Sequence, residues 1–125
     1  MKIYLPPLML MGLIFISSSI PMDGESEHLK FLMELKPTVQ NLLHIPLFGL
    51  LAYLWLNALT KNGCPAKKKL IITIIITVSY GLLDEFHQSF IPGRYASLSD
   101  MLLNIIGIIT GAVIYLQMKK VRSKE

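Results

Sequence analysis

Four apolar segments, each close to the length of a membrane-spanning helix, occupy most of this 125-residue chain. They cover about residues 3–20, 42–59, 70–88 and 98–118, and a helix needs roughly 20 apolar residues to cross a bilayer. Hydrophobic residues make up 53% of the sequence and charged residues only 16%, which is too apolar for a soluble domain of this size. Because backbone polar groups in lipid must be satisfied within the protein, the sequence predicts an all-α fold. We expect one domain over residues 1–125, an integral membrane bundle of four transmembrane helices.

The basic residues indicate an orientation for this bundle. Nine of the twelve Lys and Arg residues fall near the two termini or between the second and third segments. By the positive-inside rule both termini are then cytoplasmic, and the first and third loops lie outside. The net charge of +4 does not indicate nucleic acid, since the basic residues sit at loop ends. The first segment could instead be a signal peptide cleaved after Ser19, although its apolar run is longer than usual.

A polar motif joins the third and fourth segments. It comprises Asp84-Glu85-Phe86-His87-Gln88, then Pro92-Gly93-Arg94, Asp100 and Asn104. Counting 1.5 Å per residue from Leu70 places the two adjacent carboxylates about 21 Å into a hydrocarbon core roughly 30 Å thick. Burying unpaired charges there costs several kcal/mol, so ionisable residues at this depth predict a functional site.

Helical periodicity predicts that the polar residues converge. In the third segment one stripe contains Thr73, Thr77, Tyr80, Asp84 and His87, and Gln88 lies one turn beyond Asp84. In the fourth segment another stripe contains Asp100, Asn104, Gly107 and Gly111, whose two glycines let helices approach closely. With His44 in the first turn of the second segment, we expect one outer-leaflet ligand-binding pocket lined by His44, Asp84, Glu85, Gln88, Arg94, Asp100 and Asn104.

Several of these residues have simpler explanations. Asp100 completes Ser97-Leu98-Ser99-Asp100, a capping-box pattern at a helix start, with or without a role in the site. The dipeptide Pro92-Gly93 is most simply a turn, and His87 an interfacial histidine. The carboxylates of the motif oppose the dipole of a helix C-terminus, which leaves Arg94 or His44 as the expected counter-charge.

The motif resembles the signature of the VanZ-like family of small bacterial membrane proteins. The resemblance rests on residues 84–94 with Ser97, Asp100 and the stripe that follows, and on residues 41–48 around His44. Two positions depart from the family pattern, since Gln40-Asn41 replaces an Asp-Lys pair and Phe48 replaces a tyrosine. The family's namesake is linked to low-level teicoplanin resistance. The resemblance therefore implies a multi-pass protein of the bacterial plasma membrane that modulates envelope chemistry or glycopeptide susceptibility.

Three functions are compatible with these residues. The first is a binding module whose pocket recognises a lipid headgroup or a lipid-linked cell-wall precursor, with Arg94 on phosphate. The second is a hydrolase or transferase with Glu85 or Asp84 as general base and His44 as partner, which leaves a divalent metal possible. The third is proton-coupled transport, for which no charged path across the membrane is evident. We expect no resident cofactor or metal, and the single Cys64 offers neither a disulfide nor a zinc site.

Overall fold

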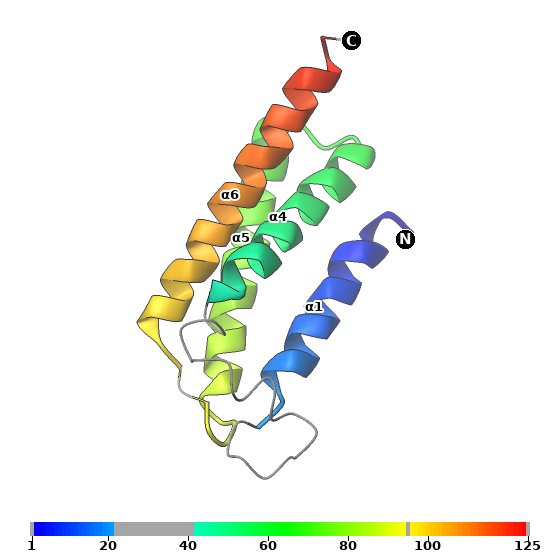
Figure 1. Ribbon diagram of the computed structural model, residues 1–125. Helices are drawn as coiled ribbons and strands as arrows, with labels where there is room; N and C mark the ends of the chain where they lie inside the picture. The colour runs from blue at the N-terminus through cyan, green and yellow to red at the C-terminus, as the bar shows by residue number, and fades with distance from the viewer. Residues whose placement is uncertain (1, 22–41, 95, 125) are drawn as a thin grey trace.

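The computed structural model describes residues 2–21, 42–94 and 96–124. This part of the chain folds into four α-helices (Figure 1), which confirms the all-α prediction. A single 3-10 turn, η1 (Lys2–Tyr4), leads into α1, and the helices are α1 (Leu5–Ser18), α4 (His44–Lys61), α5 (Ala66–Gln88) and α6 (Leu98–Arg122). The first loop, on which part of the predicted orientation rests, lies outside the described residues, and the orientation stays a prediction.

The ends of α5 and α6 differ most from the predicted segments. Helix α5 begins at Ala66, directly after Pro65, so the lysines expected in a loop occupy its first turn. Pro65 has φ −56° and ψ 148°, an extended conformation that suits the residue before a helix but not its interior. Helix α6 continues to Arg122, because its last turn carries basic side chains that favour a helix C-terminus.

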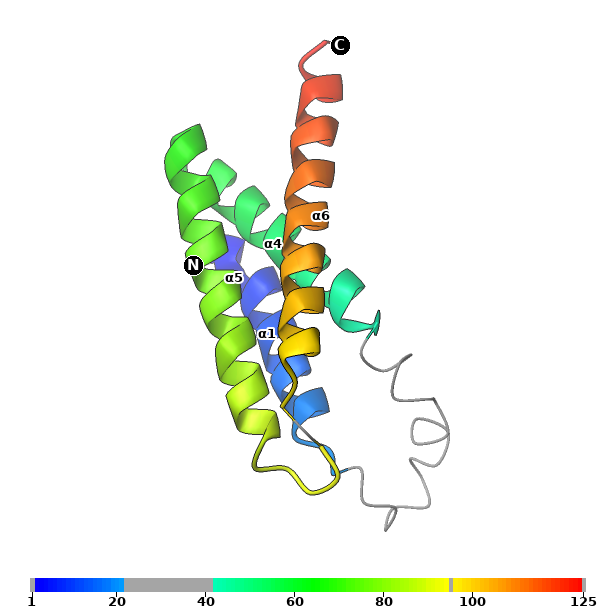
Figure 2. The ribbon, with the colours of Figure 1, turned by 90° about the vertical axis from the view of Figure 1, so that its left-hand side faces the viewer.

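Helices α4 and α6 make the most extensive contact in the bundle, through glycines. Figure 2 shows α4 crossing α6 obliquely. A Cβ atom added at Gly111 would collide with the backbone of Gly49, and one at Gly107 with the backbone of Ile45. The absence of side chains at these positions therefore brings the two backbones together. This crossing sets the position of the first turn of α4, which carries His44.

Apolar side chains fill the centre of the bundle and also cover its surface. Phe48, Leu51 and Ala52 of α4 are fully buried, and Ile14 of α1 packs into the same core. Many other large apolar side chains on α1, α5 and α6 are half or more exposed. Within the described residues, α5 and α6 are long and apolar enough to cross a membrane, and α1 is a shorter apolar helix. An apolar exterior of this kind suits contact with lipid rather than water.

Candidate functional site

Three helices bring polar side chains to one end of the bundle. Helices α4 and α6 begin at this end and α5 finishes there, so their terminal turns lie together (Figure 1). Asp84, Glu85, Asp100 and Asn104 are 3%, 7%, 5% and 0% exposed, respectively. We call this group the acidic cluster and define it as His44, Asp84, Glu85, Gln88, Asp100 and Asn104. Six of the seven residues predicted for the pocket thus form this cluster, whereas Arg94, at the same end of the bundle, binds carbonyls at the end of α1.

His44 on α4 and the carboxylates of Asp84 and Glu85 on α5 each have a hydrogen-bond partner on one side. The His44 Nδ1 atom lies 2.8 Å from Asn104 Oδ1. Gln88 Nε2 donates to Asp84 Oδ2 at 2.8 Å, and the main-chain amide of Ser97 donates to Glu85 Oε2 at 3.3 Å. The two carboxylates therefore each have one oxygen occupied by a donor.

The other side of the acidic cluster is unsatisfied. Among the described residues, four of its buried polar atoms have no hydrogen-bond partner: Asp84 Oδ1, Glu85 Oε1, Asp100 Oδ1 and Asn104 Nδ2. A buried polar group without a partner costs roughly 1–3 kcal/mol, and a charged one more. Native proteins keep few such groups, so four in one cluster indicate a place that a ligand or protons complete.

The sequence left Arg94 or His44 as the counter-charge of the carboxylates, and in the structure the guanidinium of Arg94 binds main-chain carbonyls. Its Nε donates to the carbonyl of Ile20 at 3.1 Å and its Nη2 to the carbonyl of Ser17 at 2.9 Å. Carbonyls at the end of a helix lack intrahelical partners and attract cations, so the guanidinium caps α1. Within residues 2–21, 42–94 and 96–124 no ion pair joins it to Asp84 or Glu85. Burial lowers the pKa of Arg94, while the charges of these two carboxylates raise it.

The turn after α5 explains the position of Arg94. Pro92 and Gly93 form the predicted turn, closed by a hydrogen bond of 3.1 Å from the Arg94 amide to the Ile91 carbonyl. Gly93 has φ 75°, a conformation that glycine adopts without strain. This turn directs Arg94 back toward the end of α1 rather than into the acidic cluster.

Ser97, not Asp100, caps α6. The Ser97 side chain accepts a hydrogen bond of 3.2 Å from the amide of Ser99. In a capping box the acidic residue would bind the amide of the capping serine, but here that amide donates to Glu85. The carboxylate of Asp100 is left with a buried, unpartnered oxygen instead.

Part of the polar stripe of α5 faces the interior of the bundle, and part of it contacts α1. Thr73, Thr77 and Asp84 are buried inside the bundle, as the periodicity predicted. Two other residues of the stripe contact α1: Tyr80 donates to the carbonyl of Met11, and His87 stacks on Phe15 at a centroid distance of 4.6 Å. His87 also lies 2.9 Å from the hydroxyl of Ser19. It therefore contacts α1 rather than joining the acidic cluster.

A second buried polar group at the opposite end of the bundle was missed by the sequence interpretation. Lys69 is only 3% exposed, and its Nζ donates to Thr60 Oγ1 at 2.7 Å. The ammonium also lies 5.3 Å from the centre of the Tyr115 ring, whose hydroxyl contacts Thr60. We call Thr60, Lys69 and Tyr115 the lysine cluster. The four-residue spacing from Lys69 to Thr73 and Thr77 was the available signal, because it extends the buried stripe of α5.

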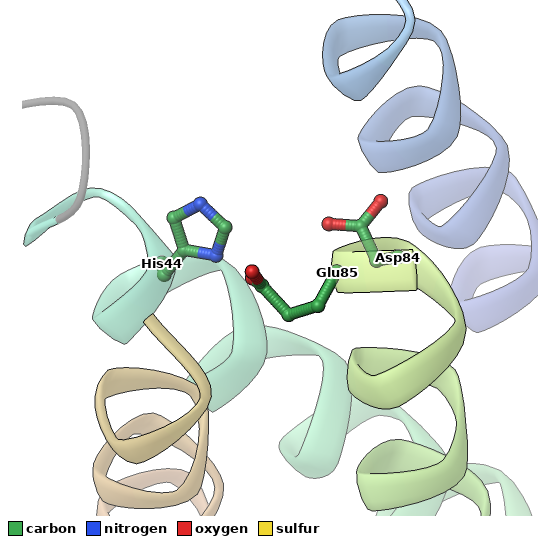
Figure 3. A group of neighbouring side chains, drawn as sticks. All are labelled: His44, Asp84 and Glu85. Atoms are coloured by element: carbon green, nitrogen blue, oxygen red, sulfur yellow. The ribbon is translucent and has the colours of Figure 1, made fainter. Parts of the chain in front are cut away.

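Three members of the acidic cluster form a group that could hold a metal ion. One ring nitrogen of His44 and one oxygen each from Asp84 and Glu85 lie within 4.8 Å of one another. Figure 3 shows the Glu85 side chain extending from α5 toward the His44 ring on α4, with the carboxylate of Asp84 beside it. This set can accept protons, bind hydroxyl or ammonium donors, or ligate a cation.

Comparison with known proteins gives one match. No curated protein and no solved structure matches the chain. The model of the VanZ/LLP1 family matches residues 3–119, which include all four helices except the last residues of α6. The chain belongs to the VanZ/LLP1 family.

Proposed function

We propose that this protein modulates envelope chemistry by binding the polar head of a membrane lipid or a lipid-linked wall precursor in the acidic cluster. The four buried atoms without partners carry this proposal, since they offer bonds that no described residue makes. Family membership and two long apolar helices indicate a membrane protein, so lipid heads are the ligands nearest to this end of the bundle.

The donors and acceptors of the acidic cluster favour a head rich in hydroxyl or amino groups. Three of its unpartnered atoms are carboxylate oxygens, which accept hydrogen bonds when ionised, and only Asn104 Nδ2 is a donor. A phosphate would instead need cations, and the guanidinium of Arg94 binds carbonyls of α1 and Ile20. A sugar or an amino group therefore complements the cluster better than a bare phosphate does.

A nearby groove supports a ligand with an apolar tail. A cavity of about 630 Å³ lies between α4 and α6, and its almost entirely apolar lining begins at Ile45 and Pro46 and reaches Met118. The groove starts at the residue after His44, although it shares no residue with the acidic cluster. A lipid whose head is held by the cluster has an apolar surface close by for one chain.

Catalysis is a second candidate function, favoured by the closeness of His44 to the two carboxylates of α5. In a hydrolase or transferase, Glu85 or Asp84 would act as general base and His44 as its partner. The two functions differ in what an amide substitution does. A glutamine still accepts one hydrogen bond, but it cannot take a proton.

The test measures susceptibility to lipophilic glycopeptides together with membrane abundance. It compares wild type with Glu85→Gln, Asp84→Asn and His44→Gln, and uses His87→Gln as the matched histidine control because His87 contacts α1. Binding predicts a partial loss in each of the three variants, whereas catalysis predicts complete loss in Glu85→Gln and His44→Gln. Unchanged susceptibility in all three at normal abundance would contradict both functions.

A further inference from the structure

We propose that His44, Asp84 and Glu85 form a binding site for a divalent metal cation. The group combines an imidazole on α4 with two buried carboxylates on α5, and its ligand atoms lie within 4.8 Å of one another. This proposal does not depend on the proposed lipid ligand, since a cation can bind the purified protein by itself. The sequence predicted no resident metal and left a divalent metal open only in the enzyme interpretation.

The separation of the three side chains suits a shared ion. Zn²⁺ and Mg²⁺ bind nitrogen and oxygen ligands at about 2.0–2.2 Å and Ca²⁺ binds oxygen at about 2.3–2.6 Å, so two ligands of one ion lie at most about 4.4 Å apart for the smaller ions and about 5 Å apart for Ca²⁺. The ligand atoms lie within 4.8 Å of one another, so a small rotation of the side chains, without movement of the helices, brings them within reach of one of the smaller ions. Figure 3 shows that the side chains of His44 and Glu85 point toward each other across the space between α4 and α5.

The unpartnered oxygens are the second, independent sign of a cation. Asp84 is 3% exposed and Glu85 is 7% exposed, yet Asp84 Oδ1 and Glu85 Oε1 have no partner among the described residues. A third buried carboxylate, Asp100, adds to the negative charge, and the guanidinium of Arg94 is bound to carbonyls elsewhere. Buried charges are normally paired or coordinate a metal, and here no described side chain pairs with these oxygens.

The neighbours of the three side chains hold them as outer-shell partners hold metal ligands. His44 Nδ1 lies 2.8 Å from Asn104 Oδ1, and this contact orients the imidazole ring. Gln88 and the amide of Ser97 each bind one oxygen of a carboxylate and leave the other free. Ligating histidines and carboxylates in proteins are oriented by such second hydrogen bonds.

The ligand types indicate which cations fit. One imidazole and two carboxylates suit Mn²⁺, Fe²⁺, Zn²⁺ or Mg²⁺ rather than a thiolate-seeking ion. The only cysteine, Cys64, follows α4 at the end of the bundle away from His44. Three protein ligands leave coordination positions that water or an oxygen of a bound head group fills.

The test uses Mn²⁺ as the probe on the full chain, purified in detergent after removal of metals. Electron paramagnetic resonance of free Mn²⁺ should show one saturable site per chain. We expect Asp84→Asn, Glu85→Gln and His44→Gln each to weaken binding about tenfold or more. The control His87→Gln should bind like wild type, because His87 contacts α1 instead. Thermal unfolding of each variant verifies that it remains folded.

A measurement on the wild type keeps the test valid if a variant fails to fold. Substoichiometric Mn²⁺ should broaden the imidazole resonances of His44, assigned through the His44→Gln spectrum or by site-specific labelling, before those of His87. Absence of stoichiometric binding, or binding unchanged in the folded Asp84→Asn and Glu85→Gln variants, would overturn the proposal. Metal binding without any effect of these variants on glycopeptide susceptibility would leave the metal site standing and remove the proposed envelope function.

Discussion

The two ends of the bundle each bury polar side chains, but they satisfy them differently. In the lysine cluster, the ammonium of Lys69 donates to Thr60, and the hydroxyls of Thr60 and Tyr115 contact each other. None of its side-chain polar atoms is buried without a partner in the described residues, whereas four atoms of the acidic cluster are. Both clusters lie on the same buried stripe of α5, so the difference does not come from depth in the bundle alone.

This difference separates a structural polar group from a binding site. A cluster that closes its own hydrogen bonds fixes the packing of its helices and offers nothing to a ligand. A cluster whose carboxylate oxygens lack hydrogen-bond partners destabilises the ligand-free protein. A cation or a ligand rich in hydrogen-bond donors then stabilises it most. We therefore assign the lysine cluster to stability and propose function for the acidic cluster.

The largest effect is expected from separating α4 from α6, because both clusters depend on the packing of these two helices. Replacing Gly111 by Val places a side chain against the backbone of Gly49, which cannot move away as a flexible side chain would. We expect destabilisation of about 3 kcal/mol or more, because α4 must separate from α6. Thermal unfolding and membrane abundance measure this loss. Gly12→Ala is the matched control, since its Cβ meets nothing within 4 Å, and equal loss in both variants would contradict the role of the crossing.

Neutralising the acidic cluster should separate stability from function. In the metal-free protein, the double variant Asp84→Asn, Glu85→Gln relieves buried negative charge and should unfold at a higher temperature, by the equivalent of about 1–3 kcal/mol. The same variant should lose the proposed effect on glycopeptide susceptibility, as expected where a functional site is kept at a cost in stability. A less stable protein with an unchanged phenotype would show that these carboxylates serve packing.

Capping of α6 should give a smaller effect that distinguishes Ser97 from Asp100. Ser97→Ala removes the acceptor for the Ser99 amide and should cost about 1 kcal/mol. The main-chain bond from residue 97 to Glu85 remains, so any effect on Mn²⁺ affinity should be small. Asp100→Asn should not reduce stability, and a loss equal to that of Ser97→Ala in chemical unfolding would restore Asp100 as a cap.

The smallest effect is expected in the lysine cluster. Lys69→Met keeps the length of the side chain and removes a buried charge, while Thr60 still contacts the hydroxyl of Tyr115 and donates to the carbonyl of Leu56. The lost hydrogen bond and the relieved desolvation oppose each other, so stability should change by less than about 1 kcal/mol. Unfolding and susceptibility assays measure both outcomes. A lost phenotype at normal abundance would place function at this end as well.

The sequence predicted the helices and all six residues of the acidic cluster, because apolar runs and helical periodicity reveal both. Apolar runs set the four segments, and spacings of three and four placed Asp84, Gln88 and Asn104 on inward faces. The binding partner of Arg94 was not predictable, because it depends on the direction of the turn at Gly93. Lys69 was assigned to a loop because a lysine run ordinarily marks solvent, and only the tertiary contact with Tyr115 makes its burial favourable.

The central claim is that the carboxylate oxygens of the acidic cluster that lack hydrogen-bond partners belong to a ligand site. The most direct measurement is a high-resolution structure of the full chain in lipid, prepared with saturating Mn²⁺ and inspected between Glu85 and His44. We expect one density peak, with manganese anomalous signal, at about 2.0–2.6 Å from His44, Asp84 and Glu85. Carboxyl groups that instead bond directly to each other or to His44, with no density between them, would contradict the claim.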